Sequence, residues 1–105
     1  MPAMRRPTFF ILAALAEAPR HGYGIIRRVE ELSEDAVRLG PGTMYGALDR
    51  LVEQELVVLD REEVEAGRLR RYYRLTPQGR KELAAEVQRL EQDSRVGHSA
   101  LGGAT

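Results

Sequence analysis

Hydrophobic residues recur every three or four positions in the first part of the chain, a spacing that predicts amphipathic helices. The first predicted helix follows Thr8 as its N-cap and ends at Ala18, because Pro19 stops it. The second predicted helix follows Gly22. The apolar stripes consist of Ile11, Leu12 and Leu15 in the first helix and of Ile25, Val29 and Leu32 in the second.

A third helix is predicted from about Pro41 to Glu55, with the proline in the first turn, where a missing N–H needs no partner. Residues 36–39, just before it, alternate in polarity and predict one short strand. The stripe that this third helix is expected to bury consists of Met44, Leu48 and Leu51, with Val52 beside them.

From Leu56 the pattern changes to the alternation that is typical of strands. Residues 57–59 and 69–75 predict the two strands of a hairpin, and Gly67 permits the positive φ of its loop. A last helix is expected to begin with Thr76 as N-cap and Pro77 at its first position. Its apolar stripe consists of Leu83, Val87 and Leu90.

Three helices followed by a two-stranded hairpin are the order of a winged helix-turn-helix. The predicted fold class is therefore mainly α with a small β-hairpin, with a further C-terminal helix. We expect a DNA-binding domain over residues 1–76 and a dimerisation helix over 77–95. Residues 96–105 show no pattern after Arg95 and predict a disordered tail.

Composition excludes several function classes. The chain has 105 residues, enough for one compact domain, and no apolar run long enough to cross a membrane. It contains no cysteine, which excludes disulfides and thiol catalysis and fits a cytoplasmic protein. The sequence has no catalytic set, no Gly-rich phosphate loop and no metal-ligand spacing. His21, which lies beside two glycines at a helix start, is interpreted as a local structural residue. We expect neither an enzyme nor a cofactor or metal site.

Charge is segregated along the chain although the net charge is zero. Residues 68–81 hold six basic side chains and no acidic one, whereas residues 53–65 hold six acidic side chains and one arginine. A basic stripe of this kind can bind phosphate whatever the total charge is.

The third helix carries the first set of candidate DNA contacts. Its start is lined by small residues, so the backbone can lie close to DNA and its free N–H groups favour a phosphate. The candidates are Gly42, Thr43, Tyr45, Gly46 and Arg50. The side chains of Thr43, Tyr45 and Arg50 can also touch phosphates or bases. Alternatively, Tyr45 packs against the second helix, and Arg50 pairs with Asp49 or Glu53.

The hairpin carries the second set, Arg68, Arg70 and Arg71, which can lie along the minor groove and the backbone. Glu62, Glu63 and Glu65 on the partner strand offer these arginines cross-strand ion pairs instead. Exposed pairs of this kind contribute only about 0 to 1 kcal/mol, so phosphates can displace them.

Three segments, His21–Ile25, Pro41–Leu51 and Arg71–Arg80, resemble the PadR family of bacterial regulators in order and spacing. The resemblance covers roughly Phe9 to Leu90 and matches the short branch of the family, with one helix after the wing. It implies a winged-helix repressor that dimerises through the C-terminal helix, binds a two-fold-related operator and is released by a small molecule, often aromatic or phenolic. Gly46 replaces a proline and Glu55 replaces a glycine that are common in the family.

The last helix is expected to form a homodimer through Leu83, Val87 and Leu90, because its stripe projects beyond a unit that is already closed. Alternatively, this stripe covers the chain's own core. In a dimer, the two recognition helices would lie in successive major grooves about 34 to 36 Å apart. An effector pocket is expected at the dimer interface, between the wings and the C-terminal helices, lined by Phe9, Phe10 and the stripe that contains Leu83.

Two other functions fit the same residues. A winged helix that binds protein instead of DNA is compatible with the zero net charge and the acidic first wing strand. A DNA-binding activator is not distinguished from a repressor by any residue of the chain.

Overall fold

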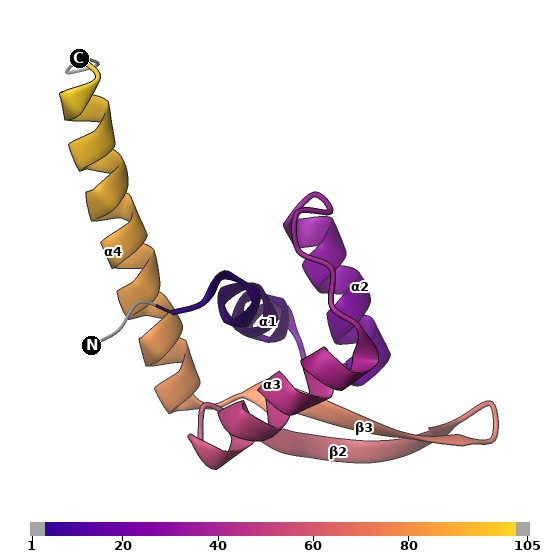
Figure 1. The fold of residues 1–105 in the computed structure, drawn as a ribbon. Helices are drawn as coiled ribbons and strands as arrows, with labels where there is room; N and C mark the ends of the chain where they lie inside the picture. The colour runs from indigo at the N-terminus through magenta and orange to yellow at the C-terminus, as the bar shows by residue number, and fades with distance from the viewer. Residues whose placement is uncertain (1–3, 103–105) are drawn as a thin grey trace.

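Three helices stand over a small antiparallel sheet, and a fourth helix leaves this body at one end (Figure 1). The computed structural model describes residues 4–102. The elements are α1 (Arg6–Glu17), β1 (Arg20–His21), α2 (Gly22–Leu32), α3 (Pro41–Glu53), β2 (Val57–Glu65), β3 (Arg68–Leu75) and α4 (Pro77–Ala100). The strand order is β1-β3-β2. This is the predicted fold class, a winged helix-turn-helix followed by one C-terminal helix.

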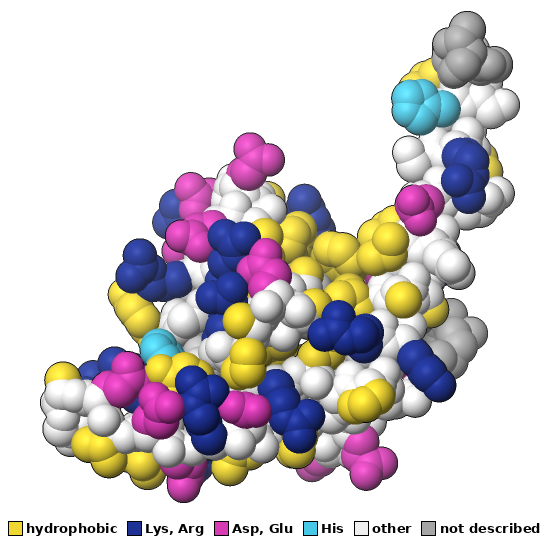
Figure 2. Space-filling model, turned by 180° about the vertical axis from the view of Figure 1, so that it is seen from behind, with side chains coloured by type: hydrophobic (Ala, Val, Ile, Leu, Met, Phe, Trp, Pro, Cys, Tyr) yellow, Lys and Arg dark blue, Asp and Glu magenta, His cyan; other side chains and the backbone are white. Residues whose placement is uncertain are grey.

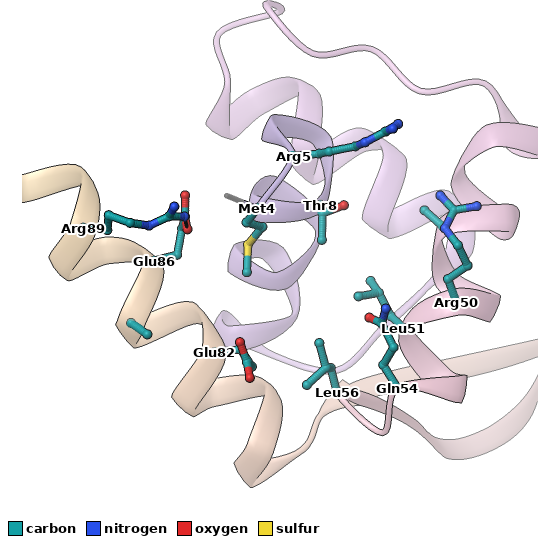
Figure 3. A pocket seen from close by; sticks show the side chains of 12 residues that line it. Met4, Arg5, Thr8, Arg50, Leu51, Gln54, Leu56, Glu82, Glu86 and Arg89 are labelled. Carbon is teal, nitrogen blue, oxygen red and sulfur yellow. Dashed lines mark hydrogen bonds and ion pairs between the residues drawn. The ribbon is translucent and has the colours of Figure 1, made fainter. Parts of the chain in front are cut away.

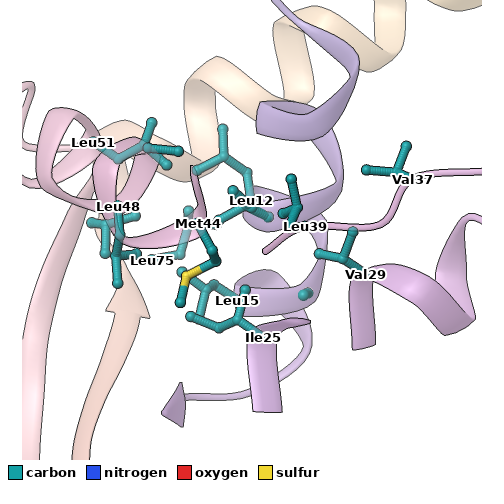
Figure 4. Packing of buried hydrophobic residues seen from close by; sticks show 14 residues of the cluster. Leu12, Leu15, Ile25, Val29, Val37, Leu39, Met44, Leu48, Leu51 and Leu75 are labelled. Carbon is teal, nitrogen blue, oxygen red and sulfur yellow. The ribbon is translucent and has the colours of Figure 1, made fainter. Parts of the chain in front are cut away.

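The core lies where α1, α2 and α3 cross, and Figure 4 shows its side chains converging from these three helices. The predicted stripes are confirmed, since Ile11, Leu12, Ile25, Val29, Met44 and Leu48 are all fully buried. Val52 is an error in the predicted stripe of α3, because 39% of its surface is exposed. With about 3.6 residues per turn, Ala47 lies between Met44 and Leu51 on the buried face, whereas Val52 lies beyond its edge.

The strand predicted at residues 36–39 is wrong. This segment is a loop after α2, and its alternation reflects the burial of Val37 and Leu39 in the core. The Ser33 hydroxyl fixes the loop by accepting from the Val37 N–H at 3.0 Å. The third strand is β1 instead, which pairs with β3 through Arg20↔Tyr73 and His21↔Tyr72.

Helix ends differ from the predictions at three places. α1 begins at Arg6 with Arg5 as N-cap, so Thr8 is not the cap, because Pro7 occupies the first turn. α3 ends at Glu53 instead of Glu55.

α4 continues to Ala100, past Arg95, so residues 96–100 of the predicted tail are helical. The helix can continue because nothing in this segment stops it. Gly97 destabilises a helix by only about 1 kcal/mol relative to alanine, and α4 contains no proline after Pro77. Residues 1–3 of the first predicted domain and 103–105 of the tail lie outside the described residues.

The start of α4 confirms the predicted capping. The Thr76 hydroxyl accepts from the Gly79 N–H at 2.9 Å, and Pro77 stands in the first turn. Within residues 4–102, no helix combines the length and the apolar character that a membrane span requires.

After α3 the backbone adopts a left-handed conformation that usually requires glycine, but the residue there is Glu55. The Leu56 N–H donates to the Leu51 carbonyl and the Glu55 N–H to the Val52 carbonyl, both at 3.0 Å, which is a Schellman motif. Glu55 takes the left-handed position of this motif with φ of 61°. A side chain with a Cβ is unfavourable there by about 1 to 2 kcal/mol.

Glu55→Gly is therefore expected to stabilise the fold by about 1 kcal/mol, which raises Tm by about 4 to 8 °C in a domain of this size. Thermal unfolding followed by circular dichroism measures the change. Glu55→Ala is the control, because it removes the charge and keeps the Cβ; a gain as large as that of the glycine variant would contradict the backbone explanation.

Candidate nucleic-acid interface

The outward side of α3 is open and begins with two glycines. Gly42, Gly46 and Asp49 follow one another on this side, opposite the buried Met44, Leu48 and Leu51, and we call them the outer ridge. A Cβ built on Gly42 would meet nothing within 4 Å, and one on Gly46 would meet only the Arg50 guanidinium at 3.9 Å. The rest of the protein therefore leaves the start of α3 uncovered, and a recognition helix requires such an uncovered side.

Tyr45 lies on one flank of the outer ridge and packs against α2. A Cβ built on Gly22 would overlap the Tyr45 hydroxyl and lie 2.7 Å from Tyr45 Cζ, so the absence of a side chain at Gly22 makes room for the phenol. Packing against the second helix is thus the interpretation that the structure supports for the Tyr45 ring. Even so, 47% of the surface of Tyr45 is exposed, and the residue lines a cleft together with arginines of the wing.

Arg50 lies on the opposite flank, away from the wing. It lines a cavity of about 480 Å³ between α1, α3 and α4, and Figure 3 shows it on α3 across the cavity from Arg89 of α4. Over residues 4–102 it forms an ion pair with neither Asp49 nor Glu53, the partners of the alternative interpretation. Thr43, near the start of the helix, is exposed.

The wing arginines and α3 line one cleft. This cleft of about 510 Å³ is lined by His21, Gly22, Tyr45, Asp49, Arg68, Leu69, Arg70, Arg71 and Tyr73, and we call it the wing cleft. It brings together Tyr45 and all three predicted wing arginines, which come from segments far apart in the sequence. Strands β2 and β3 hold them through a register that places Glu65 opposite Arg68 at the Ala66–Gly67 turn. Both turn residues have positive φ, 50° and 78°, as a two-residue hairpin of type I′ requires.

The acidic strand β2 neutralises only part of the basic strand β3. Arg71 pairs with Glu62 at 3.0 Å and Arg74 with Asp60 at 3.2 Å. Arg68 and Arg70 form no ion pair within the described part of the chain. Of the three wing arginines, Arg71 thus forms the predicted cross-strand ion pair with a glutamate of β2. Arg68 and Arg70, the two arginines nearest the turn, have no such pair in the described part of the chain.

His21 has a structural role that connects α2 to the wing. Its Nδ1 accepts from the Gly24 N–H at 3.1 Å and so caps α2, and its ring meets the Tyr72 ring edge-on at 5.2 Å. Burial, and then the positive charge of Arg70, lower the pKa of His21, which favours the neutral form that can accept this bond.

Tyr72 is a wing residue that the sequence did not single out. Its hydroxyl donates to Glu65 at 2.5 Å, and the Arg61 guanidinium lies 4.0 Å from its ring centre. The alternation of β3, which places this ring on the strand face opposite Tyr73, was the available signal.

The residues predicted for a dimer interface and an effector pocket are separated in the structure. Leu83 packs against the core of its own chain, whereas Val87 and Leu90 are 40% and 46% exposed. Phe9 and Phe10 form an edge-on aromatic pair at 5.3 Å, and Phe10 packs against the core. The cavity between α1, α3 and α4 is lined by other residues.

The sequence matches the model of the transcriptional regulator PadR-like family over residues 11–85. It is 39% identical over 93 residues to transcriptional regulator Rv3488 of Mycobacterium tuberculosis, which covers 89% of this chain and 80% of that protein. It is 45% identical over 92 residues, 87% of this chain, to a 37.1 kDa protein in transposon TN4556 of Streptomyces fradiae. The chain spans only 25% of the length of this second relative.

Solved structures share the fold. A PadR family transcription regulator from Clostridium difficile R20291 matches with a TM-score of 0.76 and 26% identity, over 92% of this chain and 99% of that one. Bacillus subtilis PadR in complex with operator DNA matches with a TM-score of 0.70 and 22% identity, over 80% of this chain and 48% of that one.

Gly22→Ala is expected to destabilise the fold by about 1 to 3 kcal/mol, because its Cβ overlaps the Tyr45 phenol. Adding Tyr45→Ala removes this overlap and leaves only Met44 Cε, the end of a flexible side chain, at 2.9 Å, so most of the loss should be recovered. Urea unfolding of the two single variants and the double variant gives the coupling free energy. Gly42→Ala is the control with open space around the new methyl group; fully additive losses at Gly22 and Tyr45 would contradict the described packing.

Proposed function

The chain belongs to the PadR-like family of transcriptional regulators, and we propose that it represses transcription by binding double-stranded DNA as a homodimer. The observation that carries this proposal is the uncovered outer ridge of α3 beside a wing cleft that contains three arginines. The fold shared with Bacillus subtilis PadR, a protein solved in complex with operator DNA, supports it.

In the proposed complex, the start of α3 enters the major groove. Gly42 and Gly46 let the backbone approach the DNA, and the free N–H groups of the first turn bind a phosphate. Thr43 and Arg50 contact the DNA backbone on one flank, and the exposed part of Tyr45 contacts it on the other. Arg68, Arg70 and Arg71 reach the adjacent minor groove, where phosphate displaces Glu62 from Arg71.

The second copy is proposed to cover α4. This helix extends well beyond the body (Figure 1), and the rest of the chain leaves Val87 and Leu90 exposed. Figure 2 shows apolar side chains exposed where the base of α4 meets the body. Leu83, at the base of α4, packs against the core of its own chain. The proposed interface therefore consists mainly of Val87 and Leu90, with Leu83 at its edge. The proposed functional division remains 1–76 for DNA and 77–95 for dimerisation.

A small aromatic effector is proposed to release the repressor from DNA. The cavity between α1, α3 and α4 supports this, because its wall combines apolar Met4, Leu51 and Leu56 with the guanidinium of Arg50 (Figure 3). Arg50 stands on the proposed recognition helix, so a ligand bound in this cavity would compete directly with its contact to DNA.

Tyr45→Ala and Arg70→Ala are both expected to weaken binding to the DNA upstream of the chain's own gene, because both remove side chains of the wing cleft. Arg70→Ala should also reduce the slope of log K against log salt by about 0.9, the loss of one phosphate contact. Gel shifts at several salt concentrations measure both effects, and circular dichroism confirms the fold. Arg74→Ala, paired with Asp60 outside the cleft, should change neither; affinity for a duplex that ignores salt would favour a protein-binding module instead.

Leu90→Glu is expected to convert the dimer to a monomer with an unchanged fold, because the side chain is exposed in the single chain and would place a charge in the proposed interface. Sedimentation equilibrium measures the mass. Gln88→Glu, which adds the same charge on the other side of the same helical turn, should leave the dimer intact. A dimer that tolerates the Leu90 change would place the interface elsewhere.

A further inference from the structure

Asp49 is the first side chain on the outer ridge, because the two ridge positions before it are glycines. It is exposed and lines the wing cleft together with Arg68, Arg70 and Arg71. Even so, it forms no ion pair or side-chain hydrogen bond with any residue from 4 to 102. The acceptor position next to Arg71 is taken by Glu62 of the wing. The wing therefore does not need Asp49 for its own structure.

A carboxylate at this position lowers affinity for DNA unless it finds a hydrogen-bond donor, because the phosphates carry the same charge. The neighbouring phosphates offer only acceptors. In the proposed complex α3 lies in the major groove, and the outward side that carries the outer ridge faces the base edges as far as Asp49 in the third turn. The donors within reach of the outer ridge are therefore the amino groups in the major groove.

Those amino groups are the N4 group of cytosine and the N6 group of adenine. A carboxylate accepts hydrogen bonds and donates none. Adenine places its N7 acceptor beside N6, which repels a second carboxylate oxygen, and guanine and thymine present only acceptors on their major-groove edges. Of the four bases, cytosine therefore fits a carboxylate best.

We propose that Asp49 reads a cytosine in each operator half-site by accepting a hydrogen bond from its N4 amino group. This inference rests on the proposed function and adds the residue that determines base preference at one position. The glycines before Asp49 bring the helix close enough for its short side chain to reach the base. The wing arginines supply affinity, and Asp49 supplies selectivity.

The experiment is selection of bound duplexes from a random-sequence library with the full chain, followed by competition binding at one fixed salt concentration. The wild type is compared with Asp49→Asn, Asp49→Ala and Glu53→Gln. The last variant is the matched control: it removes one negative charge from α3 one turn further on, where Glu53 is exposed beside the base of the wing.

The wild type should select a C·G pair at one position of each half-site. Asp49→Asn should change this preference to A·T, because an amide both donates to N7 and accepts from N6 of adenine. Asp49→Ala should lose the preference, on the order of tenfold in relative affinity, and bind unrelated DNA more tightly. Glu53→Gln should keep the cytosine.

Two results would overturn the proposal in distinguishable ways. A wild-type motif that Asp49→Ala retains at every position, or that Glu53→Gln alters as Asp49→Ala does, would show that residue 49 reads no base, while the proposed function stands. A wild type that selects no motif, and whose binding to random duplexes does not weaken in a separate salt titration, would overturn the proposed function together with this inference.

Discussion

The fixed rotation of α3 about its own axis is the constraint on which the rest of the molecule depends. Met44, Leu48 and Leu51 are buried against α1 and α2, with Ala47 completing the inward face. Because a helix is rigid, fixing one face determines where every other side chain on it lies. The outer ridge is thereby turned away from the body, Tyr45 is turned toward Gly22 and the wing, and Arg50 toward α4. A small loss of this packing would rotate the candidate DNA contacts together.

The same constraint extends to the wing and to α4 through a single junction at Leu56. The Leu56 carbonyl accepts from the Thr76 N–H at 3.0 Å, and the Thr76 hydroxyl donates to the Glu55 carbonyl at 2.6 Å. A Cβ on Gly79 would overlap the Leu56 carbonyl oxygen, so the first turn of α4 fits only because this residue is glycine. The end of α3, the base of the wing and the start of the C-terminal helix therefore form one rigid corner. In the proposed dimer, a contact between two copies through α4 would act on the orientation of α3 and the wing through this corner.

The sequence predicted the parts of the fold in which local periodicity and burial coincide. The stripes of α2 and α3 and the capping of α4 by Thr76 depend on neighbours three or four residues away, and all of these were predicted correctly apart from Val52. The loop at 36–39 shows where this reasoning fails, because alternation reports which side chains are buried and not whether a partner strand is present. The pairing of β1 with β3, and the contact between Tyr45 and Gly22, depend on residues more than twenty positions apart, and no local pattern encodes them.

The ion pairs of the wing explain how a chain with zero net charge can still present unpaired arginines. Acidic residues of β2 form ion pairs with Arg61, Arg71 and Arg74, whereas Arg68 and Arg70 beside the turn form none within residues 4–102, as their proposed contact with a phosphate backbone requires. Sequence-independent affinity grows with each phosphate that a protein neutralises, so a wing with few available arginines binds random DNA weakly. A regulator built in this way has to distinguish its operator from other DNA through shape and base contacts, to which the proposed dimer would add a second half-site. An acidic side chain on the outer ridge has the same effect, because it lowers the affinity for every DNA sequence that offers it no hydrogen-bond donor.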